Sequence, residues 1–282
     1  MFAKLSNTWS LMKASWDVLR RTKGLVVFPM LSAVSCLAIL ASCAVPLAIS
    51  GAWHPPAANA ELQQKIVYYG ALFVFYFCNY VIITYFNVAV VAGAVARMSG
   101  GEPTIGSCFH EANRRIHLIL GWAAVSGTVG LVLRIIEDRS PKFGQFVAGL
   151  LGTAWALASF LVVPVLVVQN KGPLDALKES GRLLRKTWGE QIIGNFGFGL
   201  VFFLLALPGI VVAGVGVYFL TANNAMLGVV CIGVALLYMI AVALVQSTLQ
   251  AIFQAAVYLH TQGIHDHGFS AELMSGAIVA KP

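Results

Sequence analysis

Hydrophobic residues in this chain fall into five long stretches that contain no Asp, Glu, Lys or Arg. These stretches cover residues Leu25–Trp53, Ile66–Ala96, Ile116–Leu133, Phe143–Asn170 and Gln191–Leu259. The last has 69 residues. As one helix it would reach about 100 Å, against a hydrocarbon core of about 30 Å. The polar break Thr221–Asn224 is a turn signal that divides it. The pattern therefore predicts an all-α membrane bundle of about six transmembrane helices.

Each predicted pair of spans is preceded by a polar segment that carries a helical stripe of apolar residues. The spacing of three or four is typical of an amphipathic helix. The stripes are Leu5, Trp9, Met12, Trp16 and Leu19, then Ile105, Phe109, Ala112 and Ile116, then Leu174, Leu177, Gly181, Leu184 and Trp188. Pro103 and Pro173 stand where a first-turn proline belongs. With basic residues on the opposite face, such helices are expected to lie in the headgroup plane of an anionic leaflet.

The amphipathic segments also resemble one another. Residues Ser15–Gly24 and Ser180–Gly189 share Ser, Leu, Arg, Thr and Gly at matching positions, and Glu111–Arg114 echoes Glu179–Arg182. We infer a threefold repeat of interfacial helix, span, external turn and span. A single membrane domain would then contain the repeats 1–98, 102–170 and 172–260, followed by a C-terminal cytoplasmic tail at 261–282.

The composition supports a membrane location, and the basic residues give an orientation. The chain of 282 residues is 59% hydrophobic and 10% charged, far below the roughly 25% charge of soluble domains. Of its 18 Lys and Arg residues, 14 lie on the side of both termini and the interfacial helices. Lys and Arg mark the cytoplasmic side. We therefore expect a multi-pass protein with both termini in the cytoplasm and no affinity for nucleic acid.

The chain resembles a family of uncharacterised bacterial polytopic membrane proteins, defined by a domain of unknown function. The stretches that carry the resemblance are Ser15–Pro29, Phe86–Thr104, Val163–Gln191 and Phe253–Leu273. The resemblance covers almost the whole chain. It implies a bacterial inner membrane and a six-span fold, and it brings no catalytic residues with it.

The organised charge of the chain lies on the interfacial helices. We expect these residues to form a basic cytoplasmic collar for anionic lipid headgroups and for a possible homo-oligomer or protein partner. The collar consists of the cations Arg20, Arg21, Lys178, Arg182, Arg185 and Lys186 and the anchoring tryptophans Trp9, Trp16 and Trp188. The predicted function is non-enzymatic: the protein would organise or sense the bilayer.

Polar amides in the second and sixth spans suggest an alternative. Gln246, Gln250 and Gln254 recur every four residues on one helical face, and Asn79 and Asn87 lie on the second span. They could line the path of a channel or transporter for a small or amphipathic solute. Hydrogen bonding between helices explains the same residues, and this reading is favoured for both groups.

Charge inside the predicted spans is nearly absent, which weakens a proton-coupled transporter. Arg134 comes closest, near the outer end of the third span, and Glu137 and Asp138 follow it at the spacing of helical ion pairs. Proline kinks are expected at Pro46, Pro164 and Pro208.

No catalytic residue, cofactor site or metal site is predicted. His110, Glu111 and Arg114 miss the spacing of a zinc-protease helix because Arg stands where the second His is needed. His260, His265 and His267 could bind a transition metal, but an ordinary tail turn is the favoured reading. The five cysteines form no ligand spacing and read as small apolar residues.

Overall fold

The computed structural model describes residues 2–50, 61–139, 141–187, 197–222 and 224–263, and all regular structure in these ranges is helical. The all-α prediction is therefore confirmed. The elements are α1 (Phe2–Arg21), the short 3₁₀ helix η1 (Lys23–Val26), α2 (Val27–Ser50), α3 (Leu62–Met98), α4 (Ile105–Arg114), α5 (Ile116–Arg139), α6 (Pro141–Ala158), α7 (Val162–Gln169), α8 (Pro173–Thr187), α9 (Gly197–Thr221) and α10 (Ala225–Thr261).

Six helical segments in the described part of the chain are long and apolar enough to cross a bilayer, as predicted. They cover Lys23–Cys43, Leu62–Met98, Ile116–Asp138, Gly144–Gln169, Val201–Thr221 and Ala225–Thr261. Each of the amphipathic helices α1, α4 and α8 precedes a pair of these spans in the chain. The order of elements thus follows the predicted alternation, while the exact domain and repeat boundaries stay predictions.

Two of the spans are much longer than the others, and their length organises the molecule. Helices α3 and α10 have 37 residues each, which corresponds to about 55 Å at 1.5 Å per residue. A hydrocarbon core of about 30 Å needs only about 20 residues. The remaining turns must find partners outside the hydrocarbon. In both helices these surplus turns lie at the C-terminal end, where the buried residues are.

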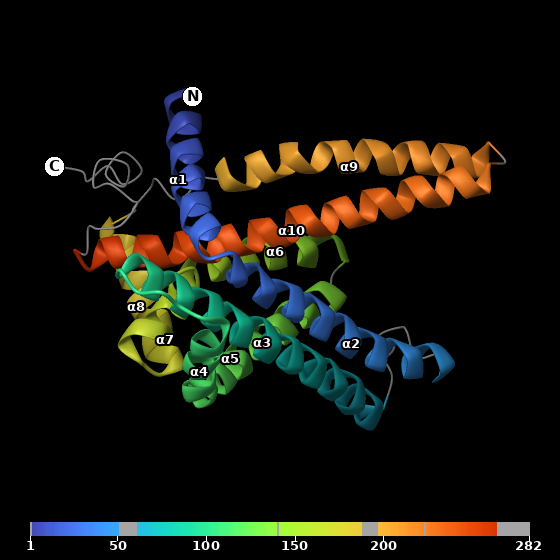
Figure 1. The fold of residues 1–282 in the computed structure, drawn as a ribbon. Helices are drawn as coiled ribbons and strands as arrows, with labels where there is room; N and C mark the ends of the chain where they lie inside the picture. Colours follow the sequence, from blue (N-terminus) through green and yellow to red (C-terminus); the bar gives the residue numbers. More distant parts are fainter. Residues whose placement is uncertain (1, 51–60, 140, 188–196, 223, 264–282) are drawn as a thin grey trace.

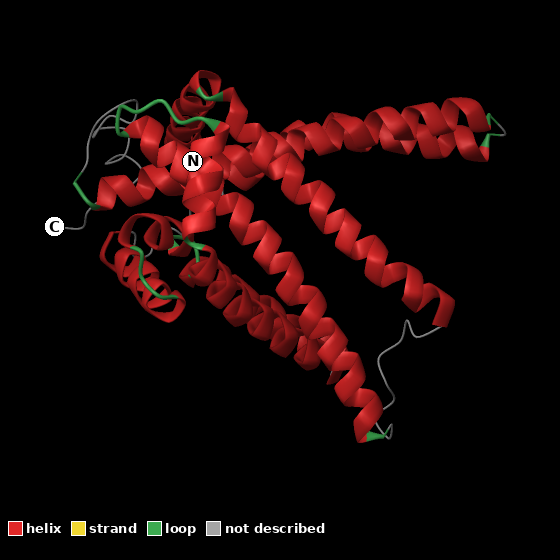
Figure 2. Cartoon of the chain, turned by 60° about the horizontal axis from the view of Figure 1, so that its bottom comes forward, coloured by secondary structure: helices red, strands yellow, loops and turns green. Residues whose placement is uncertain are grey.

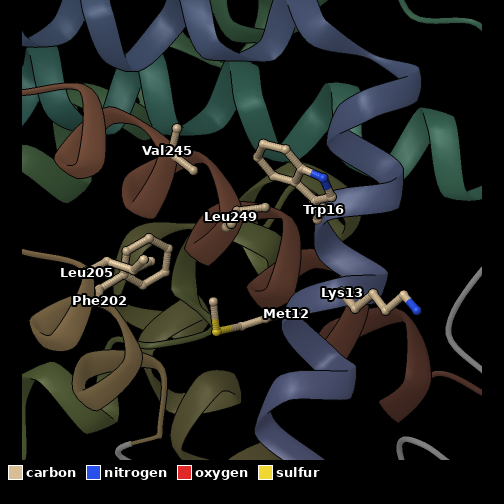
Figure 3. A pocket seen from close by; sticks show the side chains of 7 residues that line it. All are labelled: Met12, Lys13, Trp16, Phe202, Leu205, Val245 and Leu249. Carbon is tan, nitrogen blue, oxygen red and sulfur yellow. The ribbon is translucent and has the colours of Figure 1, made fainter. Parts of the chain in front are cut away.

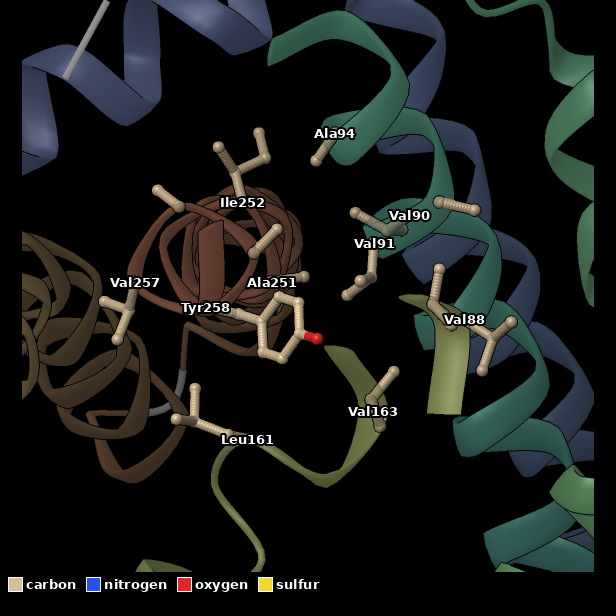
Figure 4. Packing of buried hydrophobic residues seen from close by; sticks show 14 of the residues in the cluster. Val88, Val90, Val91, Ala94, Leu161, Val163, Ala251, Ile252, Val257 and Tyr258 are labelled. Carbon is tan, nitrogen blue, oxygen red and sulfur yellow. The ribbon is translucent and has the colours of Figure 1, made fainter. Parts of the chain in front are cut away.

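The buried residues of the chain gather around these surplus turns. The C-terminal parts of α3 and α10 pack with each other, with α7 and with the second half of α1. We call the packed C-terminal parts of α3 and α10, together with α7, the hub, and α1, α4 and α8 pack on it. Figure 4 shows its centre, where Ile252 and Tyr258 of α10 face Val91 and Ala94 of α3. Gln169 at the end of α7 donates a hydrogen bond of 2.8 Å to the Tyr258 hydroxyl.

The spans leave the hub as hairpins. α2 pairs with α3, α5 with α6, and α9 with α10. α3 also packs along α5, so these two hairpins share a helix contact. The α9/α10 hairpin diverges from the others, and its far end stands alone (Figures 1 and 2). Large apolar side chains such as Val217 and Met226 are exposed there. These surfaces match the lipid phase and not water.

The fourth span is interrupted, which the sequence did not predict. Residues 159–161 form a turn between α6 and α7. The Leu161 amide in this turn donates to the Ser180 hydroxyl of α8 at 3.0 Å. Pro164 is the third residue of α7 and so lies in a first turn, where it costs no helical hydrogen bond. The expected kink is therefore replaced by a break just before the proline, and α9 continues as a helix through Pro208.

Close packing at the hub gives a first prediction at Gly93 of α3. A Cβ atom on Gly93 would lie 2.6 Å from Leu25 Cδ2 and 2.8 Å from Cys108 Sγ, both in buried residues. Gly93→Ala should therefore destabilise the protein by about 1–3 kcal/mol through overpacking. Thermal unfolding in detergent should show the loss as a Tm lower by several degrees.

The matched control is Gly70→Ala in the same helix, where a Cβ atom would meet nothing within 4 Å. This variant should be neutral or slightly stabilising, because alanine favours the helix over glycine by about 1 kcal/mol. An equal effect of both substitutions would contradict the packing of α3 against η1 and α4.

Candidate functional site

The three interfacial helices pack against the hub through small residues. Ser15 of α1, Ala112 of α4 and Ser180 of α8 are each 0% exposed. They occupy equivalent places in the aligned segments, since Ser15 aligns with Ser180 and Ala112 follows Glu111 as Ser180 follows Glu179. A small side chain allows the close approach of two helices. The same position thus makes the contact in all three helices.

The predicted apolar stripes are buried at some positions and exposed at others. Ala112 and Leu184 are buried, whereas Leu174 is 59% exposed and Ile105 is 41% exposed. Other buried residues stand beside the stripes, as at Cys108 of α4 and Ala176 of α8. The sequence could not separate these faces, because apolar side chains serve both a protein contact and a lipid contact.

The described collar cations all lie on the outer face of their helices. Arg20, Arg21, Lys178, Arg182 and Arg185 are exposed. Arg20 stacks over the Trp16 ring, with its guanidinium carbon 5.6 Å from the ring centre. Lys186 belongs to α8 and Trp9 to α1, but their side chains lie outside the described part of the structure, as does the whole of Trp188. α1 and α8 lie on different sides of the hub (Figure 1), so the cations border it and do not form one cluster.

Two glutamates anchor the cations of α4 and α8. Glu179, almost buried, accepts from Arg182 at 2.8 Å and from Lys171 at 3.1 Å. Glu111 binds Arg115 closely and lies 3.8 Å from Arg114. In each case the hydrogen bond from arginine holds the pKa of the carboxyl below its ordinary value, against the opposite effect of burial. The two glutamates, aligned in sequence, therefore play the same part in two helices.

Arg115 connects the interfacial helix α4 to the broken span. Its side chain is 9% exposed, and Nη2 donates to the Val167 carbonyl of α7 at 2.7 Å. Nη1 donates to the Glu111 carbonyl at 3.0 Å and to its carboxylate. The C-terminal carbonyls of a helix lack partners within that helix. The buried Arg115 at the end of α7 is a donor for one of these carbonyls. Its positive charge also interacts favourably with the negative end of the α7 dipole.

The amides of the alternative transport path do not converge on one lumen in the described residues. Asn79 donates to the Phe75 carbonyl of its own helix at 2.8 Å. Gln250 is exposed, and Gln246 and Gln254 are half-buried. Asn87 lines a cavity of about 70 Å³, which it shares with Ser32 of α2 and Ser247 of α10. Its buried Oδ1 has no partner among the described atoms, and the space suits ordered water.

The remaining predicted polar residues have clear positions. Arg134 pairs with Glu137 at 3.5 Å and with Asp138 at 3.2 Å, as the spacing predicted. Within the described ranges no group of three potential metal ligands comes together. His265 and His267 lie outside the described residues, so the metal hypothesis for His260, His265 and His267 stays untested.

Sequence reasoning missed Arg115, Ser180 and the pair of Gln169 and Tyr258. Glu111 and Arg115 do have ion-pair spacing on a helix. That spacing gave no reason to distinguish Arg115 from its neighbour Arg114. Only the fold brings Val167 and Leu161 to these side chains.

Comparison with known proteins places the chain in a family. Residues 66–269, from early in α3 to beyond the end of α10, match a family of unknown function, DUF6159. The chain belongs to this family. No curated protein matches the chain. The matched region includes α4, α8 and the ion pairs of both helices, and it begins after α1 and α2.

Arg115 gives the second prediction. Arg115→Ala should destabilise the protein by about 3 kcal/mol, since it removes a buried charge partner and leaves the Val167 carbonyl without a donor. Thermal or denaturant unfolding in detergent measures this loss. The matched control is Arg114→Ala, because Arg114 is 64% exposed and lies 3.8 Å from the same glutamate. That variant should cost less than about 0.5 kcal/mol. Similar losses would contradict the connection to α7.

Glu179 gives a pH prediction. Its folded-state pKa is lowered by the hydrogen bonds from Arg182 and Lys171. Its contribution to stability is therefore complete above the unfolded pKa of about 4.3 and is lost as the pH falls through the lower folded pKa. Unfolding temperatures measured from pH 7 to pH 3 should fall less steeply in Glu179→Gln than in the wild type. Parallel pH curves would contradict the proposed pairing.

Proposed function

We propose that this chain is a non-enzymatic integral membrane protein that organises or senses the bilayer. It would do so by binding anionic lipid, or a protein partner, through its basic interfacial helices. The observation that carries the proposal is the division of α1 and α8 into two faces. Small buried residues hold each helix to the hub, and the described collar cations all face outward.

The energetics favour a lipid surface as the ligand of these cations. A Lys or Arg near an anionic leaflet contributes about 1 kcal/mol. Arg21 and Arg185 make no ion pair with a described residue, so their charge is available. Arg182 and Lys178 are partly neutralised by Glu179 and Asp175. Several such weak contacts on one protein add up to a useful preference without a deep binding site.

The location that fits this proposal is the cytoplasmic face of a bacterial inner membrane. The excess of Lys and Arg on the side of the interfacial helices supports it. The hub would then lie at the inner headgroup level, with both termini in the cytoplasm. The surplus turns of α3 and α10 would leave the hydrocarbon on that side, since their C-terminal ends are the buried ones.

A channel or transporter is the alternative function. The cavity at Asn87 favours it, because an unpartnered amide oxygen lies there together with two serines from other spans. The positions of Asn79 and Gln250 give it no support, since the first is satisfied within its own helix and the second is exposed. The lipid proposal explains more of the described charge.

Lipid retention tests the proposal. Wild-type protein in detergent, mixed with phosphatidylglycerol and phosphatidylcholine of equal chain length, should retain the anionic lipid preferentially in native mass spectrometry. The double variant Arg21→Glu and Arg185→Glu should lose most of this preference. Two reversed charges, at about 1 kcal/mol for each charge removed, correspond to at least a tenfold change.

The matched control reverses two charges at the other side of the spans, Lys65→Glu with Lys142→Glu. It should leave the preference unchanged, because neither residue belongs to the interfacial helices. Equal retention of the two lipids by the wild type, or equal loss in both double variants, would refute a lipid-binding collar.

A further inference from the structure

An open cavity of about 400 Å³ lies between α1 and the α9/α10 hairpin. α1 contributes Met12, Lys13 and Trp16 to its wall, α9 contributes Phe202 and Leu205, and α10 contributes Val245 and Leu249 (Figure 3). Six of these seven side chains are apolar or aromatic, and Lys13 carries the one charge in the wall. Pockets of this size and lining are typical of sites for apolar or amphipathic small molecules.

The position of the cavity suggests the source of its ligand. α1 crosses the base of the α9/α10 hairpin, where the two spans leave the hub (Figure 1). On the faces of α9 beside the cavity wall, Phe203, Leu204 and Leu207 are exposed. The cavity therefore lies at the boundary between an interfacial helix and the hydrocarbon. Lipid is the most abundant apolar molecule at this depth, and water has too few polar partners in such a wall.

Charge at the rim selects the kind of lipid. Lys13, Trp16 and Arg20 follow one another at spacings of three and four, so they lie along one face of α1. Lys13 and Arg20 are exposed, and Arg20 is held over the Trp16 ring. Two cations about 10 Å apart along the helix thus border the aromatic side chain that forms part of the wall. This arrangement complements an anionic headgroup above an apolar chain. A second copy of the protein would bring the same positive charges and would be repelled.

We propose that this cavity binds one acyl chain of an anionic lipid, with the lipid phosphate beside Lys13 and Arg20. The inference rests on the proposed lipid-binding function and gives it a defined site. A lipid in this place contacts α1, α9 and α10 at once. The position of α1 against the hairpin would then depend on the lipids available, which is a physical means of sensing the bilayer.

Photo-crosslinking of the wild type tests the site without any substitution. The full chain is reconstituted in vesicles of phosphatidylcholine with a small fraction of phosphatidylglycerol that carries a diazirine in its acyl chain. Irradiation should label Met12 or Trp16 together with Phe202 or Leu205, as mapped by peptide mass spectrometry. Labels confined to the outer faces of the spans, or crosslinks between two copies at these positions, would overturn the proposal.

Two variants separate the chain site from the charge. Leu205→Trp should fill the cavity and reduce labelling at Met12 about tenfold, while the matched control Leu204→Trp, on the same exposed helix and outside the wall, should not. Lys13→Glu should reduce labelling by the phosphatidylglycerol probe, again about tenfold. A phosphatidylcholine probe with the same diazirine chain should be unaffected.

The outcomes distinguish this site from the collar as a whole. Unchanged labelling in Leu205→Trp would reject the binding of an acyl chain in the cavity. A wild-type preference for phosphatidylglycerol that depends on Arg21 and Arg185 would still support the proposed function. Equal labelling by the phosphatidylglycerol and phosphatidylcholine probes, in both the wild type and Lys13→Glu, would reject the selection of an anionic headgroup at this site. Loss of labelling in Leu205→Trp together with a selective loss in Lys13→Glu would support both parts of the inference.

Discussion

The structure depends on a mismatch between helix length and bilayer thickness. α3 and α10 extend about 55 Å, nearly twice the hydrocarbon core. Their surplus turns cannot remain as bare apolar surface at the headgroup level, because water meets the chain there. α7 packs on these turns to form the hub, and the interfacial helices cover it. The spans beyond the hub need no such cover, since lipid is their solvent. The bundle is therefore compact at one end and open at the other.

The interfacial helices have to satisfy three environments at once, and their residues divide accordingly. Small side chains such as Ser15 and Ser180 face the hub, and large apolar side chains such as Leu174 border it. Charges occupy the third face. Glu111 and Glu179 show that this charge is partly structural, because each of them fixes arginines of its own helix. A collar of uncompensated cations would repel itself, and internal carboxylates reduce this repulsion without removing the net positive charge.

The sequence was sufficient for features that depend on local spacing. The six spans, the amphipathic helices and the pairing of Arg134 with Glu137 and Asp138 all follow from periodicity, and the structure has them. Features that depend on partners far along the chain were missed. The Leu161 amide in the break at 159–161 donates to the Ser180 hydroxyl, and Arg115 donates to the Val167 carbonyl, 52 positions away. The stripes likewise did not show which of their positions are buried in protein, since hydrophobicity does not distinguish lipid from protein.

The attachments of the interfacial helices differ, and this difference bears on which of them could respond to lipid. α4 is joined to α7 through buried Arg115, and α8 is joined to the turn at Leu161 through buried Ser180. Both connections use directional bonds in the protein interior, so displacement would leave polar groups unpaired. α1 packs on α9 and α10 beside a cavity of about 400 Å³. The wall of this cavity is apolar except for Lys13, so whatever fills the cavity contacts α1 and the hairpin together. α1 is therefore the interfacial helix whose contacts the proposed lipid would share, while α4 and α8 are joined to the fourth span through buried side chains.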